Sequence, residues 1–545
     1  MVRRSKEGLP LRRSFGTGPL PARQSAAPRP LLRGVCGTLA PALALLSAVA
    51  MAGCGAIGGG SRPATPEVVT GFQGGVVADE PSATLAGREV LATNGTAVDA
   101  AVAMAFVQAV TLPATAGLGS GGVCLLYDPA RKRLETIDFS LRPASRSLLG
   151  VPALVRGMAL LHARGGTQRW EQLLAPAERL ARLGAPVSRA MLANLSADTG
   201  LTPVRPPLRP LFAGAQLGGT LVQPDLAVTL GRLRASGAGD FYTGVFARQL
   251  VDGIAALQGD LTAEDLRTFV PSLREPLLVP FGTSQVVLPP PPAGAGGAIA
   301  AQYLAGLTQA NWAGARQEDR VHLAVEVLKR TIAAESSRAD GEPILSPARA
   351  QALVAGLDRT KAQPVEGASL PAAAEAPSAG LVAIDSSGMA VACAMTLGSR
   401  FGTGVQVPGT GLFMAAAPRV IPVSTLPALV VNTRSSQTFA ALSSFHDRSA
   451  PQNAILTILG TLVEERTLEV VLSRPRLHAG AGPVQLEPEA VDSAGVLEDR
   501  GHPLERVQEL GRVHAIICPT GLPQRQPVCD LRADPRSGGL AAGGQ

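Results

Sequence analysis

The sequence predicts an α/β sandwich in which helices cover β-sheets. Three observations support this class. The stretches 123–139 and 380–397 each have the pattern of a strand–turn–strand hairpin. Residues 96–110 are apolar nearly all round, which is typical of a helix buried between layers. Helical periodicity dominates residues 152–270, between the two hairpins.

Composition excludes several classes of protein. The chain has 545 residues, enough for about two to four domains with a sizeable core. Its formal net charge of +7 comes from residues 1–53, which hold eight basic groups and one acid, so the rest of the chain is neutral. Only 3% of the residues are aromatic. A neutral body with few aromatic rings does not fit a nucleic-acid partner.

The N-terminal segment has the features of a signal peptide. Basic residues precede an apolar run, 35–52, that is too short and too interrupted by Pro and Gly for a membrane span. Small residues lead into Cys54, as in a bacterial lipobox, and a Gly/Ser/Pro-rich tether follows. We expect a signal peptide over 1–53 and a tether over 54–70. The protein would be exported to the periplasm or cell surface and held on the membrane only by a lipid on Cys54.

Two alternatives stay open for this segment. Ala-Gly-Cys can arise by chance in an Ala-rich chain, and Arg12-Arg13 hints at a twin-arginine signal, although it lies far from the apolar run.

The first half of the body has a clear order of elements. We expect a strand at 74–78, helices at 81–94 and 96–110, and the hairpin formed by 123–127 and 134–139. Gly95 ends the first of these helices. A further helix is expected over 318–336.

The pattern changes after a stretch rich in Pro, Ala and Gly, 338–377, which is either a linker or a processing loop. From Ser378 onward strands dominate, beginning with the hairpin of 380–385 and 390–397. The remaining expected elements are a helix at 451–465 and strands at 428–432, 484–487, 513–518 and 528–531.

The four cysteines after the tether fall into two pairs. Cys518 and Cys529 flank a short loop between two strand-like runs, and export places them in an oxidising space, so we predict a disulfide worth about 3 kcal/mol. Cys124 and Cys393 lie within apolar strands, where we expect buried thiols. No Cys and His spacing indicates a metal site, and we expect neither a metal nor another cofactor.

Many segments, in order over about 71–535, resemble the γ-glutamyltransferase family of the N-terminal nucleophile hydrolases. The resemblance implies a four-layer αββα sandwich made as a precursor and cut into large (71–377) and small (378–545) subunits that form a heterodimer. The matching segments are Asn94-Gly-Thr-Ala-Val-Asp-Ala-Ala101, Gly117-Leu-Gly-Ser-Gly-Gly122, Val151-Pro-Ala-Leu-Val-Arg-Gly157, Leu173-Leu-Ala-Pro-Ala177, Asp240-Phe-Tyr-Thr-Gly244, Asp260-Leu-Thr-Ala-Glu-Asp-Leu266, Pro290-Pro-Pro-Ala293, Phe401-Gly402 and Pro408-Gly-Thr-Gly411.

The resemblance places the nucleophile at Ser378. In the family a Thr that starts the small subunit stands seven residues before an Asp turn, and counting back from Asp385 reaches Ser378. A Ser hydroxyl can work as Thr does, because the α-amine freed by cleavage of Pro377–Ser378 can take its proton. The alternative is that Ser378 is merely a loop or strand-cap Ser after a proline.

The resemblance also supplies supporting residues. Thr396 matches a Thr that hydrogen-bonds the nucleophile, and Ser424 with Thr425 matches a Ser pair that holds the substrate carboxylate. Each also fits a plain strand hydroxyl. The family's Arg after Asp138-Phe139 is replaced by Ser140, so Arg142 is the candidate for the glutamyl carboxylate, unless it is simply solvated.

Other family positions differ. Gly398 replaces an Asn, the apolar stretch 415–418 replaces an Asp pair, and His446-Asp447 falls near the Gly-Gly that forms the oxyanion hole. We interpret Ser443, Ser444, His446 and Asp447 as a polar turn, because such tight spacing does not build a catalytic triad.

These residues predict a γ-glutamyltransferase-like hydrolase or transferase that acts on γ-glutamyl amide bonds of small molecules such as glutathione. The alternative function is a catalytically degenerate family member that serves as a binding or scaffold lipoprotein. Such a protein would not need the substrate-binding polar residues that are replaced here. A purely structural lipoprotein has no positive signal in the sequence.

Overall fold

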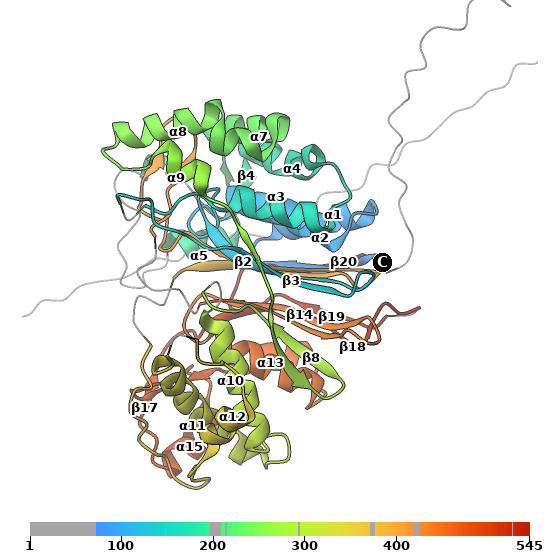
Figure 1. Cartoon of the computed structure of the whole chain (residues 1–545), viewed down its shortest axis with the longest axis vertical. Helices are drawn as coiled ribbons and strands as arrows, with labels where there is room; N and C mark the ends of the chain where they lie inside the picture. Colours follow the sequence, from blue (N-terminus) through green and yellow to red (C-terminus); the bar gives the residue numbers. More distant parts are fainter. Residues whose placement is uncertain are drawn as a thin grey trace, which may run out of the picture. The chain divides into compact units, whose positions relative to one another are not determined.

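The computed structural model describes residues 72–147, 149–196, 209–212, 215–292, 295–339, 341–370, 376–417, 424–525 and 527–544. All of them belong to one compact unit, 66–545. Two sheets lie face to face and helices cover the outer face of each (Figure 1). The leader, Cys54 and the tether lie outside the described residues. Among the described helices, none combines the length and apolar character needed to cross a bilayer.

The first sheet carries the hairpin that begins at Ser378. Its seven strands run in the order β20-β1-β9-β10-β2-β3-β6, and each neighbouring pair is antiparallel. β9 and β10 lie in the middle, where every residue is buried. The strands are β1 (Gly74–Ala78), β2 (Gly121–Asp128), β3 (Arg133–Phe139), β6 (Ser272–Arg274), β9 (Ser378–Asp385), β10 (Ala390–Thr396) and β20 (Leu540–Gly544).

The second sheet has the order β19-β18-β14-β13-β8-β7, again antiparallel throughout. Its strands are β7 (Leu277–Phe281), β8 (Ser284–Leu288), β13 (Thr425–Asn432), β14 (Gln437–Phe445), β18 (Arg512–Leu522) and β19 (Asp530–Arg532). Three small sheets complete the set: β4 (Ala185–Pro186) with β5 (Thr220–Leu221), β11 (Gln406–Val407) with β12 (Leu412–Phe413), and β15 (Leu477–His478), β16 (Val484–Leu486) and β17 (Leu504–Arg506).

Helices from the first half of the chain cover the first sheet (Figure 1). α2 (Ala97–Thr111) is buried along its whole length, and Thr96 and Asp99 form a capping box at its start. Its apolar side chains pack with those of the first sheet in one core. The other helices of this half are α1 (Pro81–Ala92), α3 (Leu154–Gly165), α4 (Trp170–Leu183), α5 (Arg189–Ser196), α6 (Arg209–Phe212), α7 (Pro224–Thr243), α8 (Val245–Ala256) and α9 (Ala263–Thr268).

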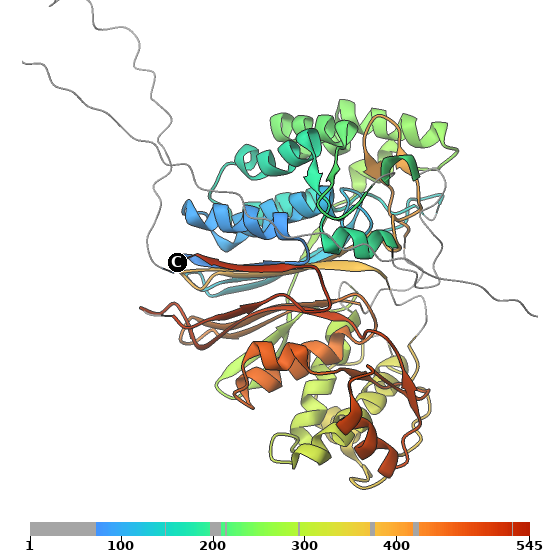
Figure 2. The ribbon, with the colours of Figure 1, turned by 180° about the vertical axis from the view of Figure 1, so that it is seen from behind.

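A second group of helices covers the outer face of the second sheet, as the view from behind also shows (Figure 2). α10 and α13 contribute directly to the core beneath that sheet. The group consists of α10 (Ala295–Gln309), α11 (Gln317–Ser336), α12 (Pro347–Val354), α13 (Ala450–Leu462), α14 (Leu468–Ser473) and α15 (Val491–Asp499). The predicted four-layer αββα sandwich is therefore confirmed.

A third core lies between the two sheets and joins side chains of β1, β2, β9 and β10 to those of β8, β13, β14 and β18. The sheets approach closely at Gly380. A Cβ at that position would lie 2.6 Å from ring atoms of Phe445 and from the hydroxyl oxygen of Ser443. Ser443 itself donates a hydrogen bond across the interface to the carbonyl of Cys393 (2.9 Å).

The structure corrects three of the sequence expectations that concern a cysteine pair, a turn and a loop. Cys124 and Cys393 are bonded in a disulfide, and are not free buried thiols; they face each other across β2 and β10. Ser443 and Ser444 belong to the buried strand β14, so only His446 and Asp447 lie in the turn. The stretch 338–377 contains α12, which Ser346 caps. A second disulfide joins Cys518 and Cys529, where the sequence led us to expect one.

Candidate active site

Ser378 is the first residue of β9 and is almost fully buried. Its hydroxyl donates a hydrogen bond to the backbone carbonyl of Ser424 (3.0 Å) and accepts one from the backbone N–H of His446 (2.9 Å). Ser424 immediately precedes β13 of the second sheet, and His446 immediately follows β14 of the same sheet. The hydroxyl is therefore held between the two sheets by backbone groups alone.

The position of Ser378 follows from how β9 is anchored to α2. At the far end of the β9–β10 hairpin, the Asp385 carboxylate accepts hydrogen bonds from the N–H groups of Ser387 and Met389, and from Ala97 at the start of α2. Near Ser378, the side chain of Gln108 donates to the carbonyl of Gly380 (3.1 Å). Burial raises the pKa of Asp385, and these donors partly offset that rise.

Thr396 lies directly opposite Ser378 at the end of β10. Its hydroxyl donates to the carbonyl oxygen of Pro377 (2.7 Å) and accepts from the N–H of Gly398 (2.9 Å). The resemblance implied a bond from Thr396 to the nucleophile itself. In the uncut chain Thr396 instead contacts the carbonyl of the peptide bond that precedes Ser378.

Ser424 contacts the segment just before that peptide bond. Its hydroxyl accepts from the N–H of Ala376 (3.1 Å) and donates to the carbonyl of the same residue (3.0 Å). Thr425 is buried at the start of β13, where it faces Phe445 on β14. The structure thus brings Ser378, Thr396, Ser424 and Pro377 into one cluster.

Arg142 does not join this cluster. Its side chain is exposed, and its guanidinium lies over the ring of Phe269, 5.3 Å from the centroid. Within the described part of the chain, none of the polar contacts links Arg142 to Ser378, Thr396 or Ser424. The position of the family's Arg is taken by Ser140, whose N–H donates to Asp138 (3.0 Å).

His446 supplies the backbone donor at the nucleophile with an unusual conformation, since its φ is 96°. Side chains rarely adopt this left-handed region, and Gly does so freely. Burial, together with the positive charges of Arg512 and Arg400, lowers the pKa of the His446 ring to about 3. The imidazole is therefore neutral at ordinary pH, and its contact with Ser378 runs through the backbone.

A buried charged group lies close to His446, and the sequence analysis did not identify it. Asp79 Oδ1 lies 3.5 Å from Nε2 of His514, whose Nδ1 accepts a hydrogen bond from the N–H of Asp534. Nε2 of His514 therefore faces Asp79. Burial alone would raise the pKa of Asp79, but His514 and the charge of Arg512 more than offset this, and the pKa lies below its ordinary value.

A signal for this group was present in the sequence, because Asp79 and Glu80 directly follow a fully apolar strand. Carboxylates at such a place are buried as soon as the strand is central. Asp79 also donates its N–H to the carbonyl of Gly380 (3.3 Å), which ties it to β9 two residues from Ser378.

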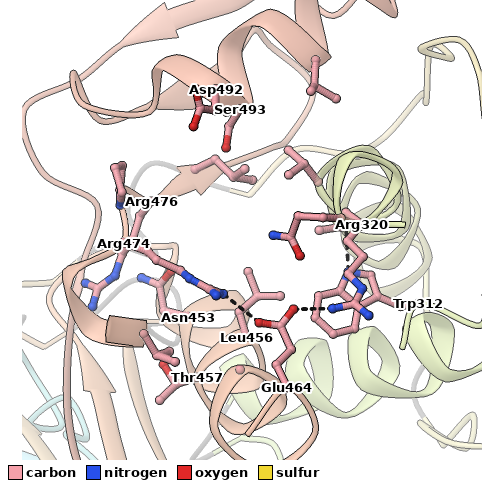
Figure 3. Close-up of a pocket in the computed structure, with 18 of the residues that line it drawn as sticks. Trp312, Arg320, Asn453, Leu456, Thr457, Glu464, Arg474, Arg476, Asp492 and Ser493 are labelled. Carbon is pink, nitrogen blue, oxygen red and sulfur yellow. Dashed lines mark hydrogen bonds and ion pairs between the residues drawn. The ribbon is translucent and has the colours of Figure 1, made fainter. Parts of the chain in front are cut away.

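A cavity of about 550 Å³ lies elsewhere, among the helices beneath the second sheet (Figure 3). Glu464 stands on one wall, where it pairs with Arg320 (2.5 Å) and Arg474 (2.9 Å). Trp312 and Asn453 line it as well, but Ser378 does not. The cavity is thus separate from the candidate nucleophile.

Fold and site together define the class. A four-layer αββα sandwich with a hydroxyl residue at the start of a central strand is the architecture of the N-terminal nucleophile hydrolases. Among solved structures, the cephalosporin acylase from Bacillus halodurans superposes with a TM-score of 0.73, at 24% identity, covering 88% of this chain and 98% of the acylase. This likeness shows that the two share a fold.

Sequence comparison gives the family. The gamma-glutamyltranspeptidase profile matches residues 83–147 and 141–417. The chain is 27% identical over 402 residues to the glutathione hydrolase proenzyme of Bacillus subtilis (strain 168), covering 64% of this chain and 68% of the relative. It is 29% identical over 511 residues to human glutathione hydrolase 7, covering 81% and 75%. The chain belongs to the gamma-glutamyltranspeptidase family.

Proposed function

We propose that this protein is an autoprocessing γ-glutamyl hydrolase or transferase in which Ser378 becomes an N-terminal nucleophile. One observation carries the proposal. The hydroxyl of Thr396 holds the carbonyl of Pro377, while two backbone groups hold the adjacent Ser378 hydroxyl. Both partners of an intramolecular acyl shift are thus fixed in the uncut chain. The names of the relatives, which include a proenzyme, support the same activity.

The processing step is an acyl shift followed by hydrolysis. Ser378 Oγ attacks the Pro377 carbonyl carbon, and the hydroxyl of Thr396 donates to the oxygen that becomes negative. The C–N bond breaks, the proton of the Ser378 hydroxyl passes to the departing nitrogen, and an ester joins Pro377 to Ser378. Water then hydrolyses the ester, which leaves a carboxylate on Pro377 and a free α-amine on Ser378.

The freed amine serves as the base for turnover. An α-amine has a pKa of about 7.7 to 8.0, so about a tenth to a sixth of it is unprotonated at pH 7, and this fraction can accept the proton of its own hydroxyl. Ser378 Oγ then attacks the amide carbonyl of the substrate, and the N–H of His446, beside that oxygen, is a donor of the kind that stabilises an oxyanion. Water or an amine resolves the acyl-enzyme.

The proposed substrate is a γ-glutamyl amide of the glutathione type. Ser424 and Thr425 would bind its carboxylate once the segment before Ser378 has moved away. Export and a lipid on Cys54 would place this reaction outside the cytoplasm, with the cut falling between a large region, 71–377, and a small region, 378–545.

A second candidate function is a binding or scaffold lipoprotein without turnover. The position of Arg142 favours it, because this side chain lies against Phe269 and supplies no cation to the Ser378 cluster. Such a protein would remain uncut or would be cut without acting on γ-glutamyl amides.

A denaturing gel of the purified protein, run with reductant, distinguishes the two functions. Cleavage before Ser378 yields pieces of 324 residues (54–377) and 168 residues (378–545). We expect Ser378→Ala to abolish both pieces and Ser378→Thr, which keeps the hydroxyl, to retain them. Release of the chromophore from a γ-glutamyl anilide then tests the substrate. A single uncut band from the unmodified protein would contradict the proposal.

A further inference from the structure

The disulfide between Cys124 and Cys393 has a special place in the chain. Cys124 is in β2 and Cys393 in β10, and the two residues are directly opposite each other in the first sheet. β2 precedes the Pro377–Ser378 bond and β10 follows it. The disulfide therefore spans the proposed cut, and its two ends are 269 positions apart in the sequence.

We infer that the mature protein is a covalent heterodimer, in which Cys124 of the large subunit is disulfide-bonded to Cys393 of the small subunit. This inference rests on the proposed cleavage at Ser378. The hydrogen-bonded sheet already holds the two pieces together, and the disulfide converts that contact into a permanent link. Cleavage releases an amine at Ser378 but does not release either piece.

The surroundings of the bond protect it. Both cysteines have no exposed surface, and they lie in the core between α2 and the first sheet. The β2–β10 ladder runs from Thr396 opposite Gly121 to Ala390 opposite Tyr127, with the disulfide at its middle pair. A thiolate must reach a sulfur atom to exchange with it. A soluble reductant therefore reaches this bond only after the two strands separate.

The link also bears on the site. Cys393 is three residues before Thr396 on the same strand, and Thr396 faces Ser378. β10 is one of the two strands of the β9–β10 hairpin that begins at Ser378. The disulfide ties this strand to β2 of the large subunit. The disulfide fixes the register of β10 against β2, in which Thr396 is opposite Gly121, while the pairing of Thr396 with Ser378 belongs to the β9–β10 ladder.

The other disulfide provides a matched control. Cys518 and Cys529 both lie in the small region, and only 11 positions separate them. Their bond closes a loop within one piece and cannot join the two pieces. Cys529 is also partly exposed, in contrast to the fully buried pair in the first sheet.

The test compares denaturing gels with and without dithiothreitol, after free thiols are blocked with N-ethylmaleimide. We expect one band of the combined mass without reductant and two bands with it. Cys124→Ala with Cys393→Ala should separate into two bands without reductant. Cys518→Ala with Cys529→Ala should still migrate as one. Two bands from the unmodified protein without reductant would overturn the inference.

Peptide mapping of the unmodified protein keeps the test decisive if a cysteine variant does not fold. Trypsin under non-reducing conditions should yield peptide 89–131, which contains Cys124, bonded to peptide 378–400. If 89–131 is instead bonded to 362–400, the disulfide exists but the cleavage proposal fails. If 378–400 appears with a blocked thiol, cleavage occurs and the covalent heterodimer is wrong.

Discussion

At the scale of single residues, His446 contributes to the site through its backbone and not through its ring. Its N–H lies 2.9 Å from the Ser378 hydroxyl oxygen, while its φ of 96° is a conformation that favours Gly. The resemblance places the family's Gly-Gly near this position. His446 thus adopts a conformation that Gly would adopt at no cost.

We expect His446→Gly to keep processing and turnover within about threefold of the unmodified protein, because the N–H remains and Gly accepts the same φ. Burial and the charges of Arg512 and Arg400 hold the pKa of the His446 ring at about 3, although Asp79 acts in the opposite direction. Removal of the ring should therefore leave the pH profile of the activity unchanged above pH 5. The profile should follow the α-amine, with activity rising through pH of about 7.7 to 8.

The measurement is kcat/KM against pH with a γ-glutamyl anilide, together with the extent of cleavage on a reducing gel. His446→Ala is the matched control, since it keeps the N–H but must adopt a strained φ, and it should be less stable than the Gly variant by about 1 kcal/mol. A loss of activity of about 100-fold in His446→Gly would show that the imidazole takes part.

Only part of the candidate site has a signal in the sequence. Counting back seven residues from Asp385, the spacing that the family resemblance supplies, reaches Ser378, the residue with which β9 begins, and its role as nucleophile stays a prediction. Cys124 and Cys393 could not be paired, since nothing local to either strand reveals that β2 and β10 are neighbours in this register. The contact of His446 with Ser378 could not be predicted from the residue type, because it is made by the backbone N–H.

At the scale of elements, β9 depends on Gly380 for its packing against the second sheet. Gly380 faces Phe445 and Ser443 on β14, and any Cβ there would overlap both. The φ of Gly380 is not in the left-handed region, so the requirement concerns space and not backbone conformation. The distance between the two sheets at the nucleophile end is therefore set by a residue without a side chain.

We predict that Gly380→Ala destabilises the fold by about 1 to 3 kcal/mol, because the added methyl overpacks a buried interface. Gly495→Ala is the control: Gly495 lies in the middle of α15 with open space around its Cβ, and the change should stabilise the helix by about 0.5 to 1 kcal/mol. Denaturant midpoints of the two variants measure both effects. Equal midpoints for Gly380→Ala and the unmodified protein would contradict the packing argument.

Elements with a strong apolar pattern were predicted well, and those without one were not. α2 was recognisable because its apolar residues are continuous and Thr96 with Asp99 caps it. β20 was missed because its sequence, Leu-Ala-Ala-Gly-Gly, has little β propensity, and its pairing with β1 depends on distant residues. β14 was missed because Ser443 and Ser444, next to His446 and Asp447, give its end the polar composition of a turn. In the structure both serines are buried in the second sheet.

At the scale of the whole molecule, the fold class was predictable and the disulfide between the two regions was not. Hairpins between helical blocks allow few other arrangements of layers. The covalent link between the two regions depends on which strands are neighbours across 269 residues, so it could not be derived from spacing alone.

The proposed lipid anchor is also a property of the whole molecule. We expect Cys54→Ser to abolish incorporation of labelled palmitate and to shift the protein from the membrane fraction to the soluble fraction, because Cys54 is the proposed acceptor. Cys36→Ser, in the same leader, should change neither result. A membrane-bound Cys54→Ser protein would show that another feature holds it there.

The contact between Ser424 and Ala376 has one further consequence. While the chain is intact, both hydrogen-bonding functions of the Ser424 hydroxyl are occupied by the backbone of Ala376. If the Ser424 hydroxyl binds substrate, the precursor is inactive for two reasons. Ala376 occupies the place of the substrate carboxylate, and the α-amine of Ser378 is still part of a peptide bond. Hydrolysis of the Pro377–Ser378 bond would create the base and would also free Ala376 to leave Ser424, so one cleavage is a precondition for both.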